Sequence, residues 1–299
     1  MTNWHQQRVR ERAYTLWEAE DRQHWNDLAH WFQAEREISP EMRVTFDSNE
    51  WEDVTCPDRC RERPERHRAL VKVHNAIREG VIRGFICEVV ATLEGLQRKE
   101  RSEFLAKQTV EPHVLDQVLP DGTTTPIIII APDQSHRPAL QLVLTDNLRS
   151  AQSIGMRVMT TLRYSELVFP SMFYAEESDD LVLIIGPVRF SIEQRGLGRS
   201  KLAEFALALG ARGTGVQVYF DIPDVPLSAS DRKKVAEYVA EWADGDAVSC
   251  HMAYHNDFFC TEDFGKGART SILDLKNREW LRNTYGVKFV TLNELAAMV

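Results

Sequence analysis

Short apolar runs that predict buried strands alternate with segments of helical periodicity along most of the chain. The predicted strands are residues 42–47, 84–87, 216–220, 258–260 and 288–291. The predicted helices are residues 66–79, 88–97, 200–209, 230–243 and 277–284, one that begins at Asp246 after Gly245, and a short one from residue 293. Apolar strands joined by helices are typical of a covered parallel sheet, so the pattern predicts an α/β sandwich with a central parallel sheet.

Residues 1–38 form a separate predicted unit. Apolar residues recur at helical spacing from Val9 to Trp17, and again from Leu28 to Phe32 after a polar break. We predict a helical hairpin whose tryptophans pack on the rest of the protein or on a partner, because two helices alone bury little apolar surface. The segment resembles a short bacterial family of unknown function, which assigns no chemistry. The matching residues are Arg8, Arg10, Ala13, Tyr14, Leu16, Trp17, Asp27, Trp31, Ala34 and Glu35.

The segment 105–190 interrupts the alternation of strands and helices. Its apolar runs are residues 126–132, 140–145, 156–161 and 181–186. Pro, Asp and Gly separate these runs, as is typical of strands joined by turns. We therefore predict a β-rich insertion, which either shapes a substrate cleft or mediates assembly.

Composition narrows the class of protein. The 299 residues are 43% apolar, enough for a substantial core, and no apolar run approaches the ~20 residues that cross a bilayer. The first residues lack the hydrophobic segment of a signal peptide, and five cysteines, an odd number, do not indicate a disulfide framework. We therefore expect a globular, cytoplasmic protein with reduced thiols and no membrane contact.

The net charge of -9 argues against a surface that binds nucleic acid throughout, so such binding needs a local basic patch. One segment after the first strand is rich in arginine. These candidates for nucleic-acid contact are Arg59, Arg61, Arg63, Arg66 and Arg68. Glu62 and Glu65 lie among them, so a solvated helix face is an equally good interpretation.

Carboxylates stand at the ends of predicted strands and at the start of one predicted helix. Asp47 ends the first strand, Asp263 follows a later strand, and Asp246 is expected at a helix N-terminus. The hydroxyl and amide side chains beside these acids are Ser48, Asn49 and Thr261. Because parallel sheets place ligands at the carboxyl ends of their strands, we expect the acids to meet at one edge.

The order of these residues resembles the PIN family of metal-dependent nucleases. In that family a helix of the form D-A-x-x-x-x-x-A precedes a strand that ends T-x-D. The matching residues here are Asp246, Ala247, Ala253, Thr261 and Asp263. Residues 47–49 match the family's D-T/S-N pattern at the end of the first strand. A fourth acid is expected on the helix after the second strand, where Glu94 is favoured and Glu88 stays open.

The resemblance implies a PIN-like three-layer sandwich over residues 42–104 and 191–299, with residues 105–190 inserted. The acids that would hold one or two metal ions are Asp47, Glu94, Asp246 and Asp263. Facing carboxylates repel unless a cation joins them, and oxygen ligands favour Mg²⁺ or Mn²⁺. The side chains that would orient these carboxylates are Ser48, Asn49 and Thr261.

The activity that the resemblance implies is that of a metal-dependent endoribonuclease, which hydrolyses RNA phosphodiester bonds. A toxin-like role with an inhibitor protein as partner stays open, as does a homo-oligomer. The alternative is a catalytically silent PIN-like protein that acts as a binding or interaction module. Binding of Mg²⁺ or Mn²⁺ that depends on the acids distinguishes the two.

Overall fold

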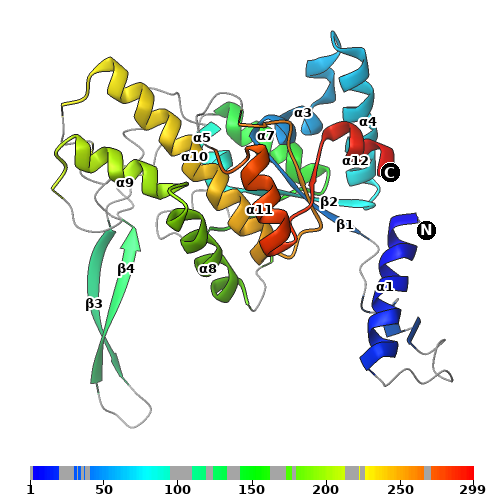
Figure 1. Ribbon diagram of the computed structural model, residues 1–299, viewed down its shortest axis with the longest axis horizontal. Helices are drawn as coiled ribbons and strands as arrows, with labels where there is room; N and C mark the ends of the chain where they lie inside the picture. The colour runs from blue at the N-terminus through cyan, green and yellow to red at the C-terminus, as the bar shows by residue number, and fades with distance from the viewer. Residues whose placement is uncertain are drawn as a thin grey trace.

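The centre of the protein is a parallel β-sheet (Figure 1). The computed structural model describes residues 3–19, 30–31, 33–34, 37, 41–94, 110–118, 124–132, 142–161, 173–176, 180–212, 222, 226–265 and 271–299. Within them the sheet has five strands, in the order β5-β2-β1-β6-β7, and every neighbouring pair is parallel. The strands are β1 Met42–Phe46, β2 Ile82–Cys87, β5 Arg157–Met159, β6 Phe258–Cys260 and β7 Phe289–Val290. The predicted α/β fold with a central parallel sheet is confirmed.

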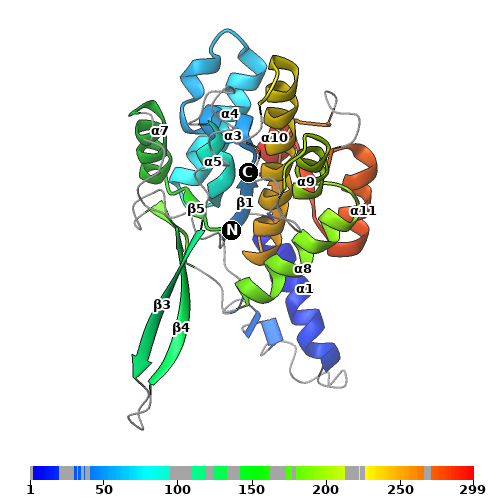
Figure 2. The same cartoon turned by 90° about the vertical axis from the view of Figure 1, so that its left-hand side faces the viewer.

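Helices cover both faces of this sheet (Figure 2). One face carries α3 Ser48–Thr55, α4 Pro64–Arg78, α7 Leu142–Ser153 and α12 Leu292–Met298. The other carries α8 Leu181–Gln194, α9 Arg199–Ala208, α10 Ala229–Ala253 and α11 Leu275–Tyr285. Side chains alternate along β1. Val44 and Phe46 pack on the face that carries α3, α4, α7 and α12, whereas Thr45 points to the other face and bonds to His251 of α10 at 2.9 Å. Burial lowers the pKa of His251 to about 3, so this core histidine is neutral.

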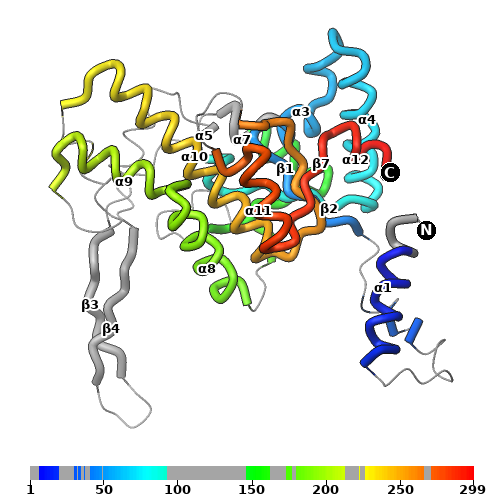
Figure 3. Tube along the Cα trace, in the orientation of Figure 1, coloured from blue at the N-terminus to red at the C-terminus, as the bar shows by residue number. Residues whose placement is uncertain are grey.

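Short helices join the strands to these layers. The helix α5 Glu88–Glu94 continues directly from β2, and the 3₁₀ turn Pro57–Cys60 connects α3 to α4. The last helix, α12, returns the C-terminus to α4 (Figure 3). It begins at a capping box in which Thr291 and Glu294 bond to each other's backbone N–H groups. The predicted strand 216–220 lies outside the described residues.

The helix α10 is one continuous element of 25 residues, so the predicted break at Gly245 is wrong. Gly245 marks a close approach between helices. A Cβ atom there would lie 3.5 Å from Ile192 Cγ2 and 3.6 Å from Gly198 Cα. The glycine therefore sits where α8 and the start of α9 pass close to α10, and Asp246 lies within a helix and not at its N-terminus.

The range 105–190 contains two strands that pair with each other, β3 Val110–Val118 and β4 Thr124–Pro132. They form an antiparallel sheet of their own. The strands predicted at 140–145 and 181–186 are wrong, because α7 and α8 are helices. In α8, buried Leu181, Ile185, Val188 and Ile192 recur at helical spacing. The run at 156–161 provides β5, which pairs with β2 in the central sheet. The limits of an insertion stay a prediction.

The N-terminal segment is helical where it is described. The helix α1 is Asn3–Ala19, and residues 30, 31, 33, 34 and 37 are also helical. Arg12 Nε lies 2.6 Å from Glu37 Oε2 and so links the two parts. Arg8 Nη1 lies 3.4 Å from Asp257 Oδ2, in the turn before β6. These ion pairs connect the N-terminal segment to itself and to the α/β domain.

Within the described part of the chain, no helix combines the length and the apolar character needed to span a membrane.

Candidate carboxylate site at the sheet edge

Asp47 stands at the carboxyl end of β1, the central strand. It is the N-cap of α3, where its Oδ1 accepts a hydrogen bond of 2.7 Å from the backbone N–H of Ser48. The residue is 4% exposed. A carboxylate at this depth loses most of its hydration, so its other oxygen needs a protein partner.

Thr261 provides that partner from the neighbouring strand. Phe46 pairs with Cys260, which places Thr261 beside Asp47. The Thr261 hydroxyl donates a hydrogen bond of 2.6 Å to Asp47 Oδ2 and accepts one of 3.0 Å from the backbone N–H of Asp263. One buried hydroxyl therefore connects the carboxylate of Asp47 to the backbone of Asp263.

This edge is also where the order of the strands reverses, between β1 and β6. The chain runs outward from β1 to β2 and β5 on one side, and β6 and β7 lie on the other. Ligands of open parallel sheets bind at this reversal, beside the carboxyl ends of the strands. Asp47 and Asp263 therefore lie at the position that the topology favours for a ligand.

The charge balance at Asp47 is unfavourable to the anion. Burial raises the pKa of Asp47, and the negative charge of Asp263 raises it further. The Thr261 hydroxyl, the Ser48 N–H and the cation of Arg278 act in the opposite direction. An added positive charge at this place would stabilise the ionised form of Asp47.

Arg278, a residue that the sequence did not indicate, holds the Asp263 loop. It lies on α11, is 6% exposed, and donates hydrogen bonds to the backbone oxygens of Asp263 and, at 2.7 Å, of Leu273. Its guanidinium lies 4.5 Å from the ring centre of Phe264 and 4.8 Å from that of Phe289. No local motif marks an arginine that acts through backbone oxygens.

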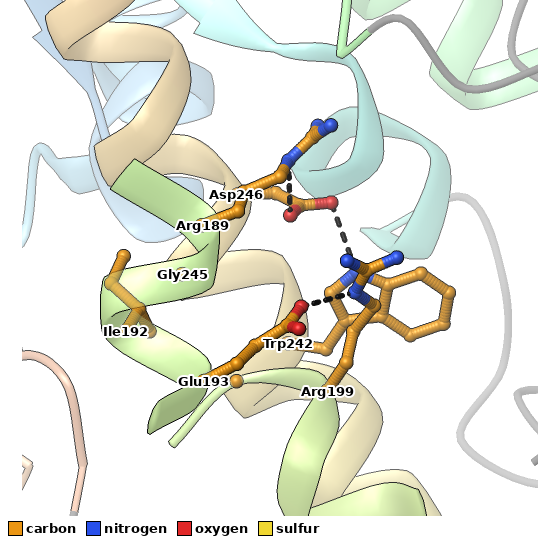
Figure 4. A pocket seen from close by; sticks show the side chains of 8 residues that line it. Arg189, Ile192, Glu193, Arg199, Trp242, Gly245 and Asp246 are labelled. Atoms are coloured by element: carbon orange, nitrogen blue, oxygen red, sulfur yellow. Dashed lines mark hydrogen bonds and ion pairs between the residues drawn. The ribbon is translucent and has the colours of Figure 1, made fainter. Parts of the chain in front are cut away.

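Asp246 is held in a separate set of interactions (Figure 4). It is 2% exposed and accepts hydrogen bonds from Arg189 Nε at 3.0 Å and from Trp242 Nε1 at 2.9 Å. Arg189 also donates to the backbone oxygen of Thr161 at 2.6 Å. These partners belong to α8, to α10 and to the segment after β5, so Asp246 is held by a different set of residues from Asp47 and Asp263.

Beside Asp246, a second ion pair joins Arg199 and Glu193 at 2.5 Å (Figure 4). The cavity between the two pairs measures only about 10 Å³, which is room for no more than one water molecule. The space that the described residues leave beside Asp246 therefore holds no ligand larger than a water molecule.

The two glutamates considered for the fourth position lie on α5. Glu88 is its first residue, is fully buried and accepts a hydrogen bond from the hydroxyl of Tyr174. Glu94 is its last residue, and its side chain lies outside the described part of the structure, as does that of Asn49. The choice between Glu88 and Glu94 stays open.

Four of the five arginines predicted as a basic patch form ion pairs. The pairs are Arg59 with Glu52, Arg61 with Asp58, Arg63 with Asp53 and Glu62, and Arg66 with Glu50, Asp53 and Glu262. Arg68 is exposed on α4. Neighbouring carboxylates offset much of this positive charge, so a nucleic-acid contact here stays a prediction.

Among the described side chains, no group of three or more His, Cys, Asp or Glu residues is arranged to hold a metal ion. Residues 5–39 match a family described as a protein of unknown function (DUF2934), in agreement with the resemblance noted for the N-terminal segment. No curated protein and no solved structure matches the chain. The matched residues include none of the acids described above, so the PIN resemblance stays a prediction.

Proposed function

We propose that the protein is a metal-dependent endoribonuclease that hydrolyses RNA phosphodiester bonds at the edge formed by β1 and β6. The observation that carries this proposal is the link from Asp47 through Thr261 to Asp263, at the carboxyl ends of two adjacent central strands. The order of Asp47, Asp246, Thr261 and Asp263 along the chain supports it, through the resemblance to PIN nucleases.

The donor set suits a hard cation in part. Asp47 and Asp263 are oxygen donors joined through Thr261, which contacts the carboxylate of Asp47 and the backbone N–H of Asp263. The raised pKa of Asp47 has causes that a bound cation would offset. Mg²⁺ commonly binds through one or two carboxylates together with waters and substrate phosphates, so two acids suffice. Asp246 does not fit as it stands, because it is paired with Arg189.

Asp47 and Asp263 would therefore hold the cation. The resemblance also implies Glu94 and Asp246 as ligands, and Asp246 would first have to separate from Arg189. When bound, Mg²⁺ or Mn²⁺ supplies positive charge to the scissile phosphate and acidifies the attacking water. Thr261 orients the Asp47 carboxylate by donating to Oδ2. Arg278 fixes the backbone at Asp263.

The test is cleavage of a labelled single-stranded RNA with Mn²⁺, with Mg²⁺ and with a chelator. We expect cleavage with either metal, none with the chelator, and none for Asp47→Asn or Asp263→Asn. The matched control is Asp146→Asn on α7, an exposed acid distant from the edge in sequence. Absence of cleavage by the folded wild-type protein with both metals would refute the proposal.

A second candidate is a catalytically silent protein that acts through binding. The ion pair between Asp246 and Arg189 favours it, because Arg189 is paired with one of the predicted metal ligands. Titration calorimetry with Mn²⁺ separates the candidates. Heat of Mn²⁺ binding that is seen for the wild-type protein and disappears in Asp47→Asn supports the nuclease. Absence of binding heat for both wild-type and variant supports the silent protein.

A further inference from the structure

Arg66, on the first turns of α4, lies among three carboxylates. Its Nη2 is 3.2 Å from Glu50 Oε2 and 2.9 Å from Asp53 Oδ2, and its Nη1 is 3.2 Å from Glu262 Oε2. The Arg66 side chain is only 16% exposed, and Glu50 is 2% exposed. Charge-assisted hydrogen bonds of this kind are the strongest that side chains make, and burial protects them from screening by salt.

Two of these partners are next to the candidate site along the chain. Glu50 lies in the first turn of α3, the helix that Asp47 caps. Glu262 lies between Thr261 and Asp263 and is the second residue after β6. Arg66 therefore connects the backbone that carries Asp47 to the backbone that carries Asp263, in addition to the link through the Thr261 hydroxyl.

The charges of the cluster keep this connection in place. Burial raises the pKa of Glu50 to about 7, against the effect of Arg66, so this acid depends on the guanidinium for its ionised form. The three carboxylates raise the pKa of Arg66, which stays a cation throughout. Without Arg66, burial would favour the protonated form of Glu50, and Asp53 and Glu262 would lose their shared cation.

We propose that Arg66 is a positioning residue, which sets the separation of Asp47 and Asp263 by holding Glu50 and Glu262 at the same time. This inference deepens the proposed function and rests on it for the role of the two aspartates. It replaces the prediction that Arg66 contacts nucleic acid, because its cation already serves three carboxylates.

A neighbouring feature allows the two roles to be told apart. Arg63, Arg66, Glu262 and Asn293 line an open hollow of about 420 Å³ beside the site. If RNA occupied this hollow and bound Arg66 directly, removing the arginine would weaken substrate binding. If Arg66 positions the acids, its removal disturbs them even when no RNA is present.

The first measurement is amide hydrogen exchange of the full chain without metal or RNA. In Arg66→Met we expect exchange at the N–H of Ser48 and of Asp263 to accelerate about tenfold, because both bonds depend on the geometry that Arg66 holds. The N–H of Phe259, bonded to Lys288 O at 2.9 Å, is the internal reference for global unfolding and should not change. Unchanged exchange at Ser48 and Asp263 would overturn the proposal.

The second measurement is the kinetics of RNA cleavage. For Arg66→Met we expect kcat to fall about 10- to 100-fold with KM within about twofold, as for groups that orient metal ligands. Arg66→Lys should recover part of kcat, since an ammonium keeps some of the contacts. A rise in KM with unchanged kcat and weaker salt dependence would show an RNA contact and refute positioning.

Two further variants complete the design. Glu262→Gln removes the charge of one of the three carboxylates around Arg66. Because the Glu262 side chain is 42% exposed, this variant gives the same test if Arg66→Met fails to fold. Arg78→Met, at the exposed end of α4, is the matched control and should leave both measurements unchanged. If the wild-type protein does not cleave RNA, the proposed function fails, and the exchange measurement alone decides the role of Arg66.

Discussion

Replacing Thr261 by valine exchanges its hydroxyl for a methyl group of similar size. The hydroxyl is fully buried and donates 2.6 Å to Asp47 Oδ2, so the variant leaves a buried carboxylate with one donor fewer. A hydrogen bond to a charged group contributes ~1.5–3 kcal/mol to folding. We expect Thr261→Val to lower the free energy of unfolding by that amount when Asp47 is ionised.

The cost should depend on pH with a defined sign. The folded-state pKa of Asp47 is raised above its unfolded value, so folded protein binds more protons and loses stability as pH rises between the two values. Thr261 lowers that pKa, so the variant loses stability more steeply with rising pH. The difference between variant and wild-type should therefore shrink as pH falls through the pKa of Asp47.

Urea unfolding from about pH 4 to about pH 8, with chelator present, measures this difference. Thr55→Val is the control, because that buried hydroxyl donates to the neutral backbone oxygen of Trp51 at 2.7 Å. Its cost should be the same at every pH. An equal pH dependence in the two variants, or a cost for Thr261→Val below about 0.5 kcal/mol throughout, would refute the reasoning.

Three other changes have expected results. Glu50→Gln should flatten the pH dependence of the unfolding free energy between about pH 5 and about pH 7. The raised pKa of Glu50, about 7, makes the wild-type protein lose stability as pH rises through this range. If urea unfolding gives a difference between variant and wild-type that does not change with pH, this prediction is contradicted. Arg189→Met should cost about 3–5 kcal/mol by leaving the buried Asp246 without its cation. Arg189→Met with Asp246→Asn should recover much of this cost in a double-mutant cycle, and additive costs would show that the pair is not coupled. Gly245→Ala should stabilise α10 by about 0.5–1 kcal/mol, because the new methyl makes ordinary contacts at 3.5 Å and 3.6 Å; a lowered Tm would mean that the neighbouring helices cannot accept it.

The sequence was sufficient for the edge that carries Asp47 and Asp263 and for the parallel sheet, except for β5, which was assigned to an insertion. Its short apolar strands and the acids that follow them are local patterns, and parallel pairing brings strand ends together. The run from Leu181 was misread because a continuous apolar segment does not distinguish a buried helix from a buried strand. Here the apolar residues at helical spacing pack against α10, and this tertiary contact stabilises the helix α8.

Partners distant in the chain were not predictable. Gly245 looks like a helix break until its approach to Gly198 is known. Asp246 looks available for a ligand until Arg189, 57 residues earlier, is seen to bind it. Arg278 carries no motif, since it acts on the backbone oxygen of Asp263. Each of these contacts is a property of tertiary packing and not of local spacing.

The hydrogen bond between Asp47 and Thr261 joins residues that are 214 positions apart. During synthesis, β1 is made well before its neighbour β6, which follows only after the long intervening segment. Until then one side of β1 presents unpaired backbone groups, and Asp47 has no partner from β6. A nascent or truncated chain that lacks β6 therefore lacks the assembled acids, and whatever chemistry they perform requires both strands.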